Sequence, residues 1–286
     1  MNKHLKIALF ALLALFAGIG LLFTGVFVAM QFGLLNVRGS ILERNAFFLN
    51  STSTPEAAIP AKPCVVDGQD ECDWSETPEW AVVEGGLRKD AEVIRRVEDE
   101  TGVPGRMMAA VVIPEQIRFF TSEREVFKRY FEPLKILGSL SQFSLGVSGI
   151  KQETARRVED HANDPSSPFY PGPEAAALLA YPEGVADRDA ELFRRLTDEK
   201  DHYYSYLYTA LYIKEVAAQW ERAGFDISGD PDALVTLFNI GFDNSRPNPN
   251  PMPGGAAITV GGRTYAFGAL GASFYRSDEL LDVFPR

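Results

Sequence analysis

The stretch VPGRMMAAVVIPEQ, residues 103–116, decides the fold, because it combines a wholly apolar run with a carboxyl directly behind it. The run MMAAVVI has no polar side chain, which is typical of a buried helix. Pro104 is compatible with the first turn of that helix, where the N–H that proline lacks would have no partner anyway. Pro114 predicts a kink just before Glu115. The segment therefore predicts a core helix that ends at Glu115.

Glu115 is the strongest candidate for a chemically active side chain. Its neighbours Ile113, Pro114 and Ile117 are apolar. Apolar surroundings remove water from a carboxyl and raise its pKa. A carboxylic acid that keeps its proton near neutral pH can donate it to a glycosidic oxygen. The alternative is a residue at the helix edge whose carboxyl reaches water.

The rest of the body reads as helical, with one exception. The sequence AAITVGGRTYAF predicts a β-hairpin with Gly261 and Gly262 as its two-residue turn. The prolines of residues 164–173 predict a loop. Helices are predicted over residues 87–100, 123–137 and 152–161, and twice within 187–223. Two more are predicted over 231–242, with Gly241 as the stop, and over 277–284, with Ser277 as the cap. The fold class predicted is mainly α with a small C-terminal hairpin.

Composition and charge narrow the possible functions. The chain has 286 residues, of which 46% are hydrophobic and 23% charged, so it can build a sizeable core. Its formal net charge is −11. An acidic chain repels phosphate backbones, which argues against sequence-independent nucleic-acid binding.

The N-terminus predicts a membrane anchor. Residues 7–30 carry no charge, and at about 1.5 Å per residue they reach about 36 Å, more than a bilayer core of about 30 Å. Lys3 and Lys6 precede the span, which places the N-terminus in the cytoplasm and the body outside. The alternative is a cleaved signal peptide, whose apolar core is shorter. In both cases the body is exported.

Two cysteines agree with export. Cys64 and Cys72 flank the short segment VVDGQDE, and an even cysteine count outside the cytoplasm predicts one disulfide. Two reduced thiols are the alternative. His4, His161 and His202 do not cluster in the sequence, so each is expected at the surface rather than as a metal ligand. The sequence predicts no metal site.

Several common catalytic motifs do not occur in this sequence. There is no G-x-x-x-x-G-K-[ST] phosphate loop and no H-E-x-x-H metal motif. The pentapeptide GVSGI resembles a nucleophile elbow, but Ile150 stands where that motif needs glycine. These observations leave Glu115 as the main candidate.

A series of short motifs resembles the lytic transglycosylases and goose-type lysozymes. The helix that ends in PEQ resembles the one that carries the family's catalytic glutamate. The segment GVSGIKQETA, residues 146–155, is similar to the loop that follows it in the family. Later motifs match at ALYIKEV and LFNIG. The matching positions, in the order that the family has them, are Glu115, Gly149, Ile150, Gln152, Tyr212, Phe238 and Asn239.

The resemblance implies a lysozyme-like α domain over residues 81–245. It follows an anchor over 1–36 and a stalk with the cysteine pair over 37–80, and precedes a hairpin and helix over 246–286. Glu115 would be the catalytic acid, Gln152 a neutral hydrogen-bonding group beside it, and the other matching positions would bind substrate. The implied protein is a murein lytic transglycosylase that needs no cofactor. It would be anchored in a bacterial cytoplasmic membrane, with peptidoglycan strands as its partner in the periplasm or extracellular space.

Other functions stay open because the chain departs from the family pattern. Gln116 stands where the family has serine, Lys151 replaces an apolar residue, and Phe238 lacks the hydroxyl of a tyrosine. A hydrolytic lysozyme is the nearest alternative. A catalytically silent module that binds glycan or a partner within an envelope assembly is the second. An anchored structural protein without a glycan role is the third.

Overall fold

Helix α5 (Gly105–Phe119) lies at the centre of the fold in the computed structural model, which describes residues 16, 20–21, 73–119, 144–145, 147–198 and 200–286. Residues 107–113 are at most 1% exposed. This confirms the buried helix that the apolar run predicts. The helix does not end at Glu115, however, because it continues through Pro114 to Phe119.

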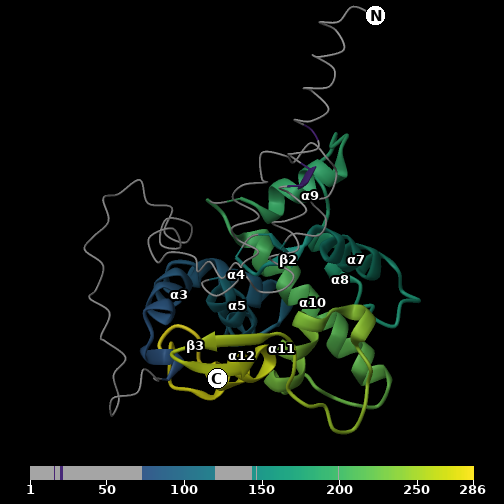
Figure 1. The fold of residues 1–286 in the computed structure, drawn as a ribbon. Coiled ribbons are helices and arrows are strands. Elements are labelled where there is room, and N and C mark those ends of the chain that lie inside the picture. The colour runs from purple at the N-terminus through teal and green to yellow at the C-terminus, as the bar shows by residue number, and fades with distance from the viewer. Residues whose placement is uncertain (1–15, 17–19, 22–72, 120–143, 146, 199) are drawn as a thin grey trace, which may run out of the picture.

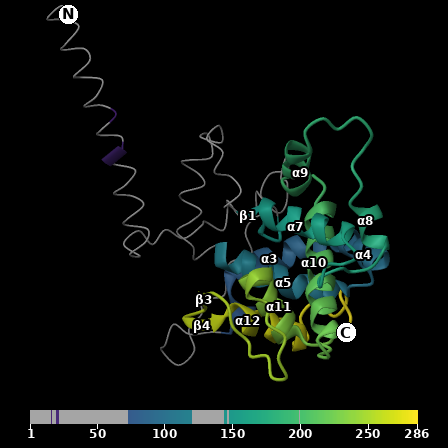
Figure 2. The same cartoon turned by 90° about the vertical axis from the view of Figure 1, so that its right-hand side faces the viewer.

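Helices from both ends of the described body pack around α5 (Figures 1 and 2). The predicted pair within residues 187–223 is confirmed as α9 and α10, and the loop over 164–173 lies between α7 and α8. The elements are η1 (Trp74–Glu76), α3 (Pro78–Lys89), α4 (Ala91–Thr101), α7 (Gln152–Asn163), α8 (Glu174–Leu178), α9 (Arg188–Leu196), α10 (Tyr203–Arg222), α11 (Pro231–Ile240), η4 (Phe242–Asn244) and α12 (Phe267–Arg276).

The predicted helix over residues 87–100 is in fact parts of two helices. Helix α3 ends at Lys89 and α4 begins at Ala91, with Asp90 between them. The Asp90 carboxylate lies 2.6 Å from His202 Nδ1 and accepts a hydrogen bond of 2.9 Å from the Tyr206 hydroxyl. These two partners come from α10 and its N-terminal flank, so contacts distant in sequence fix the junction.

The C-terminal hairpin forms as predicted. Strand β3 (Ala257–Val260) pairs antiparallel with β4 (Arg263–Ala266). Gly261 and Gly262 have φ values of 57° and 76°, the positive pair that a type I′ turn requires. A second antiparallel pair is formed by two strands of two residues each, β1 (Ser144–Leu145) and β2 (Ile150–Lys151).

Helix α12 corrects the prediction for the end of the chain. The sequence predicts a helix from Ser277 onward, whereas the helix spans Phe267–Arg276 and turns follow it. Gly268 lies against Thr236 of α11, and Gly271 lies against the main-chain oxygen of Ala110, so neither site has room for a side chain. Residues 246–286 therefore belong to the same core as α5 and are not a separate appendage (Figure 1).

Residues 73–80 correct the predicted boundary of the stalk. Trp74 and Trp80 are buried and contact each other edge to face, with ring centroids 5.0 Å apart. The Trp74 indole also donates a hydrogen bond of 3.0 Å to the Ser273 hydroxyl on α12. The folded body thus begins by Asp73, not at residue 81.

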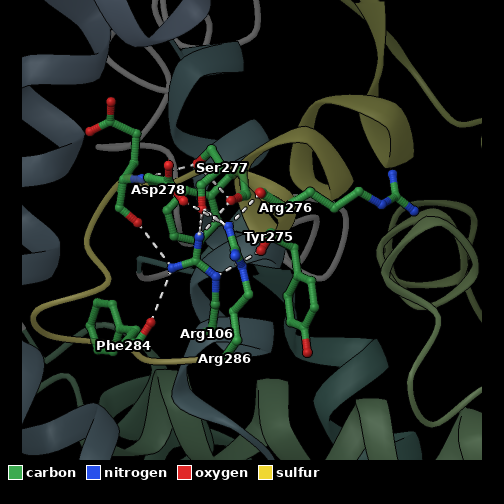
Figure 3. Close-up of polar contacts among 9 residues, drawn as sticks. Arg106, Tyr275, Arg276, Ser277, Asp278, Phe284 and Arg286 are labelled. Atoms are coloured by element: carbon green, nitrogen blue, oxygen red, sulfur yellow. Dashed lines mark hydrogen bonds and ion pairs between the residues drawn. The ribbon is translucent and has the colours of Figure 1, made fainter.

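Arg106 fastens the C-terminal segment to α5 (Figure 3). Its guanidinium is buried and makes five hydrogen bonds of 2.6–3.0 Å, all to main-chain carbonyls. The acceptors are Phe274, Tyr275, Ser277, Glu279 and Phe284. Burial lowers the pKa of Arg106. One side chain therefore satisfies the last carbonyls of α12 and holds the final turns in place.

Most of the predicted anchor and stalk lies outside the described residues, as do Cys64 and Cys72 and the helix predicted over 123–137. Within the described part of the chain, no helix combines the length and apolar character needed to cross a membrane.

Candidate active site

Glu115 lies in the C-terminal part of α5, directly after Pro114. Proline has no N–H, so it cannot donate to the carbonyl of Ala110, four residues earlier. That carbonyl instead faces Gly271 of α12, which approaches closely because it has no side chain. This packing allows α5 to continue beyond Pro114. The Glu115 side chain is only 11% exposed.

A glycine turn covers the Glu115 carboxyl. Gly149 has a φ of 65°, and a Cβ at this position would collide with the side chain of Glu115. The β1–β2 pair brackets the turn, with Leu145 opposite Ile150. Gly149 of the segment GVSGIKQETA and the acid therefore meet in space.

Two hydrogen bonds hold this turn in position. Gln116, the residue after the acid, donates from Nε2 to the main-chain oxygen of Val147. The Ser148 hydroxyl donates to the main-chain oxygen of Ser205 on α10, at 3.2 Å. Val147, Ser148 and Gln116 are all buried. The turn is thus fastened to both central helices, α5 and α10.

Arg118 makes an ion pair with the candidate acid. Its Nη2 lies 2.6 Å from Glu115 Oε1, one helical turn further along α5. A guanidinium at this distance stabilises the ionised carboxylate. The apolar neighbours in the sequence predict the opposite influence, so the environment of Glu115 is more polar than expected.

Gln152 does not lie where the resemblance puts it. Its Nε2 donates a hydrogen bond of 2.9 Å to the main-chain oxygen of Asp189 on α9, and the side chain is buried. Ile150 is also buried, in the core cluster. Gln152 therefore anchors α9 to α7, and the amide that contacts the glycine turn over the acid belongs to Gln116.

Tyr212 corrects a second prediction. Its ring is fully buried, and its hydroxyl donates a hydrogen bond of 2.8 Å to the main-chain oxygen of Leu237. Phe238 packs against it edge to face, with ring centroids 5.2 Å apart. Tyr212 therefore joins α10 to α11 and lies too deep to bind substrate. Phe238, by contrast, is only partly buried.

Asn239 lies along a line of contacts that leads back to Glu115. Its Oδ1 accepts a hydrogen bond of 2.8 Å from the Ala256 amide. The adjacent Gly255 lies against both Asn239 and Phe267. The Arg118 guanidinium lies 5.9 Å from the centre of the Phe267 ring. Asn239 thus borders the same region as the acid, with its amide oxygen already engaged.

Gly149→Ala is expected to destabilise the fold and displace Glu115. A methyl group there meets the carboxyl, and an alanine at positive φ adds strain, so we expect a loss of about 2–4 kcal/mol. Urea unfolding measures the loss. Gly102→Ala is the matched control, because Gly102 has a φ of 71° and no atom within 4 Å of a Cβ. Equal losses in the two variants would contradict the contact with Glu115.

Sequence analysis missed Gln116 and Arg118 as site residues. Gln116 entered only as a departure from the family's serine. Arg118 was detectable, since residues three apart on a helix are neighbours and an arginine there can pair with Glu115. Both lie in the stretch EQIR that directly follows Pro114.

Two histidine–carboxylate pairs lie elsewhere among the described residues, and neither histidine lies at the surface as expected: His202 is buried and His161 is partly buried. His202 pairs with Asp90, and His161 Nδ1 lies 3.1 Å from Glu215 Oε2. Burial raises the pKa of Glu215 well above its ordinary value, with Arg157 opposing the shift. Burial also lowers the pKa of His161. The second pair is therefore a neutral carboxyl facing a neutral imidazole.

Glu215→Gln is expected to flatten the dependence of stability on pH. Above the ordinary carboxyl pKa of 4.5, the unfolded chain loses a proton that folded Glu215 keeps. Unfolding free energy therefore falls as pH rises, by up to about 1.4 kcal/mol per pH unit, until the folded carboxyl ionises as well. Urea unfolding from about pH 5 to pH 8 measures this slope. Exposed Glu153→Gln should keep the parent slope; an unchanged slope in Glu215→Gln would contradict the shift.

Comparisons with family models, with curated proteins and with solved structures gave no match. The described part of the chain is mainly helical and contains two small antiparallel hairpins. Among the described residues, no three histidine, cysteine, aspartate or glutamate side chains gather closely enough to hold a metal ion.

Proposed function

We propose that this chain is a murein lytic transglycosylase, built on a lysozyme-like α domain. The observation that carries the proposal is the contact between Glu115 and Gly149. The Glu115 side chain is only 11% exposed and lies against Gly149, which has a positive φ. Gly149 belongs to the segment GVSGIKQETA, which resembles the loop that follows the catalytic glutamate in the family. The absence of a side chain at Gly149 lets backbone come close to the carboxyl.

The chemistry needs a single carboxyl. Glu115, when protonated, gives its proton to the oxygen of the MurNAc–GlcNAc bond as that bond breaks. The resulting carboxylate then takes the proton of the muramyl C6 hydroxyl, whose oxygen attacks the anomeric carbon. The product has a 1,6-anhydro-MurNAc end, and Glu115 regains its proton. Glycosidases that use water commonly need a second carboxylate, whereas here the nucleophile comes from the substrate.

The proposed setting follows from the N-terminal sequence. Residues 7–30 would anchor the protein in the bacterial cytoplasmic membrane as a single span. The body would then meet peptidoglycan strands on the outer side of that membrane. Cys64 and Cys72 would form their disulfide in the same compartment.

A silent glycan- or partner-binding module is the second candidate, and one observation favours it. The Arg118 ion pair stabilises the carboxylate form of Glu115, which cannot donate a proton. A module that binds without cleaving would tolerate such a pair.

Release of soluble fragments from labelled peptidoglycan separates the two candidates. The full chain in detergent is incubated with insoluble sacculi, and both the label in solution and the protein bound to the sacculi are measured. The transglycosylase proposal expects steady release of label. Binding without release would favour the silent module. If the protein neither bound the sacculi nor released label, both candidates would be contradicted.

A further inference from the structure

Arg118 is placed to meet a substrate at the candidate acid. It lies one turn after Glu115 on α5 and is 20% exposed, compared with 11% for its partner. On its other side it approaches the Phe267 ring at the start of α12, near the Asn239–Gly255 contact. The guanidinium therefore lies beside both the carboxyl and the Phe267 ring, and it is the more exposed member of the ion pair.

The ion pair conflicts with the chemistry proposed for Glu115. A general acid must hold a proton, and the adjacent guanidinium favours the form that has lost it. A charge-assisted contact of 2.6 Å between two largely buried groups is stronger than one at an exposed surface. Glu115 can act as an acid only after Arg118 has found another anionic partner.

We propose that Arg118 binds a carboxylate of the substrate and leaves Glu115 when that carboxylate arrives. The inference rests on the proposed function, because it takes its anion from peptidoglycan. N-acetylmuramic acid without a peptide stem carries a free lactyl carboxylate. Where a stem is attached, the lactyl carboxyl forms the amide bond to the stem, and the stem supplies the carboxylates instead. N-acetylglucosamine carries none. Arginine suits the task because its planar guanidinium can donate two parallel hydrogen bonds to one carboxylate.

The exchange balances in charge and protons. Before binding, the Arg118 cation neutralises the Glu115 anion. After binding, it neutralises the substrate carboxylate, and Glu115 takes up one proton from water. That proton is the one that Glu115 gives to the glycosidic oxygen. A neutral glycan offers no anion, so it leaves the resting pair in place.

Binding to three glycans of equal length tests the inference without any need for cleavage. The probes are a stem-free MurNAc–GlcNAc oligomer, the same oligomer with peptide stems, and a GlcNAc oligomer. Full-length Glu115→Gln is used, because it leaves the glycans intact and removes the carboxylate that Arg118 pairs with. At least one carboxylate-bearing probe is expected to bind about tenfold more tightly than the GlcNAc oligomer. Which probe binds more tightly identifies the lactyl or the stem carboxylate.

The double variant Glu115→Gln/Arg118→Met should lose this preference and bind all three probes alike. The control double variant Glu115→Gln/Arg88→Met should keep it, because Arg88 pairs with Glu84 and Asp282 on the surface. Equal binding of the three probes by Glu115→Gln, or no binding of any, would overturn the inference. A preference that survives Arg118→Met would overturn it as well.

Cleavage by the parent chain judges the proposed function separately. If the parent cleaves carboxylate-bearing glycans but Glu115→Gln binds all probes alike, the function stands and the role of Arg118 falls. If the parent cleaves nothing while the preference depends on Arg118, the transglycosylase falls and carboxylate recognition stands. In an active parent, Arg118→Met should lower kcat/KM for the preferred carboxylate-bearing glycan at least about tenfold.

Discussion

Glu115→Gln is expected to abolish glycan cleavage while the protein stays folded. Glutamine keeps the shape of the side chain under Gly149 and can still hydrogen bond, but it cannot carry the titrating proton. General acid–base catalysis typically contributes about 10²–10⁴-fold to a rate, so kcat should fall at least about 100-fold. Release of soluble muropeptides, followed with purified parent and variant, measures the loss.

The control for this variant is Glu153→Gln on α7, an exposed glutamate that should leave the rate unchanged. Thermal unfolding checks that Glu115→Gln keeps the parent's fold. Since the substituted glutamine would still fit beneath the glycine turn, the variant's binding of glycan should be nearly intact. A variant that cleaves as fast as the parent would exclude Glu115 as the acid, and Glu123, which lies outside the described residues, would be the next carboxylate to test.

Arg106→Met is expected to cause the largest loss of stability of any single substitution discussed. Methionine approximates the length of the side chain but donates none of the five hydrogen bonds to the C-terminal segment (Figure 3). The main-chain oxygens of Phe274 and Ser277 keep other donors, so the loss falls mainly on those of Tyr275, Glu279 and Phe284. Each buried acceptor that loses its partner costs about 1–3 kcal/mol, and partial rehydration of the turns offsets some of that. We expect a loss of about 4 kcal/mol in the free energy of unfolding, measured by urea denaturation.

Arg286→Met is the matched control. Arg286 donates to the main-chain oxygens of Arg276 and Ser277 and pairs with Asp278, but it is exposed. Its removal should cost less than about 1 kcal/mol. Arg106→Lys keeps the charge and loses the fork, so it should fall between the two. A loss in Arg106→Met no larger than in Arg286→Met would show that the C-terminal turns do not depend on Arg106.

The parts of the fold that could be predicted are those fixed by local chemistry. Gly261 and Gly262 give the hairpin because a type I′ turn needs two positive φ values. The apolar run of α5 can only be buried, whatever surrounds it. Gly241 follows α11 with a φ of 84°, at the stop that the sequence predicts.

The parts that could not be predicted depend on distant contacts. Gly268 and Gly271 argue against a helix in isolation, yet α12 forms because these glycines let it approach Thr236 and Ala110. The same Ala110 contact explains why α5 continues beyond Pro114. Trp74 sits in a polar stretch of the sequence, and only the packing of η1 against α12 shows it to be core.

The candidate site likewise has a part that the sequence predicts and a part that depends on distant contacts. The resemblance names both Glu115 and Gly149 as site residues, and the structure adds that they are in contact. It misplaces Gln152, because the partner of that amide is the Asp189 carbonyl on α9, a segment absent from the motifs. Arg118 carries a charge that no motif includes, although its spacing from Glu115 makes the ion pair predictable.

Mass spectrometry of the fragments that the full chain releases from peptidoglycan tests the central claim most directly. The parent is expected to release muropeptides that end in 1,6-anhydro-MurNAc, one water lighter than hydrolysis products, and Glu115→Gln is expected to release none. Fragments with ordinary reducing ends would instead assign water as the nucleophile and make the protein a hydrolytic lysozyme. No fragments at all from the parent, with several peptidoglycan types as substrate, would contradict the claim that this chain cleaves glycan.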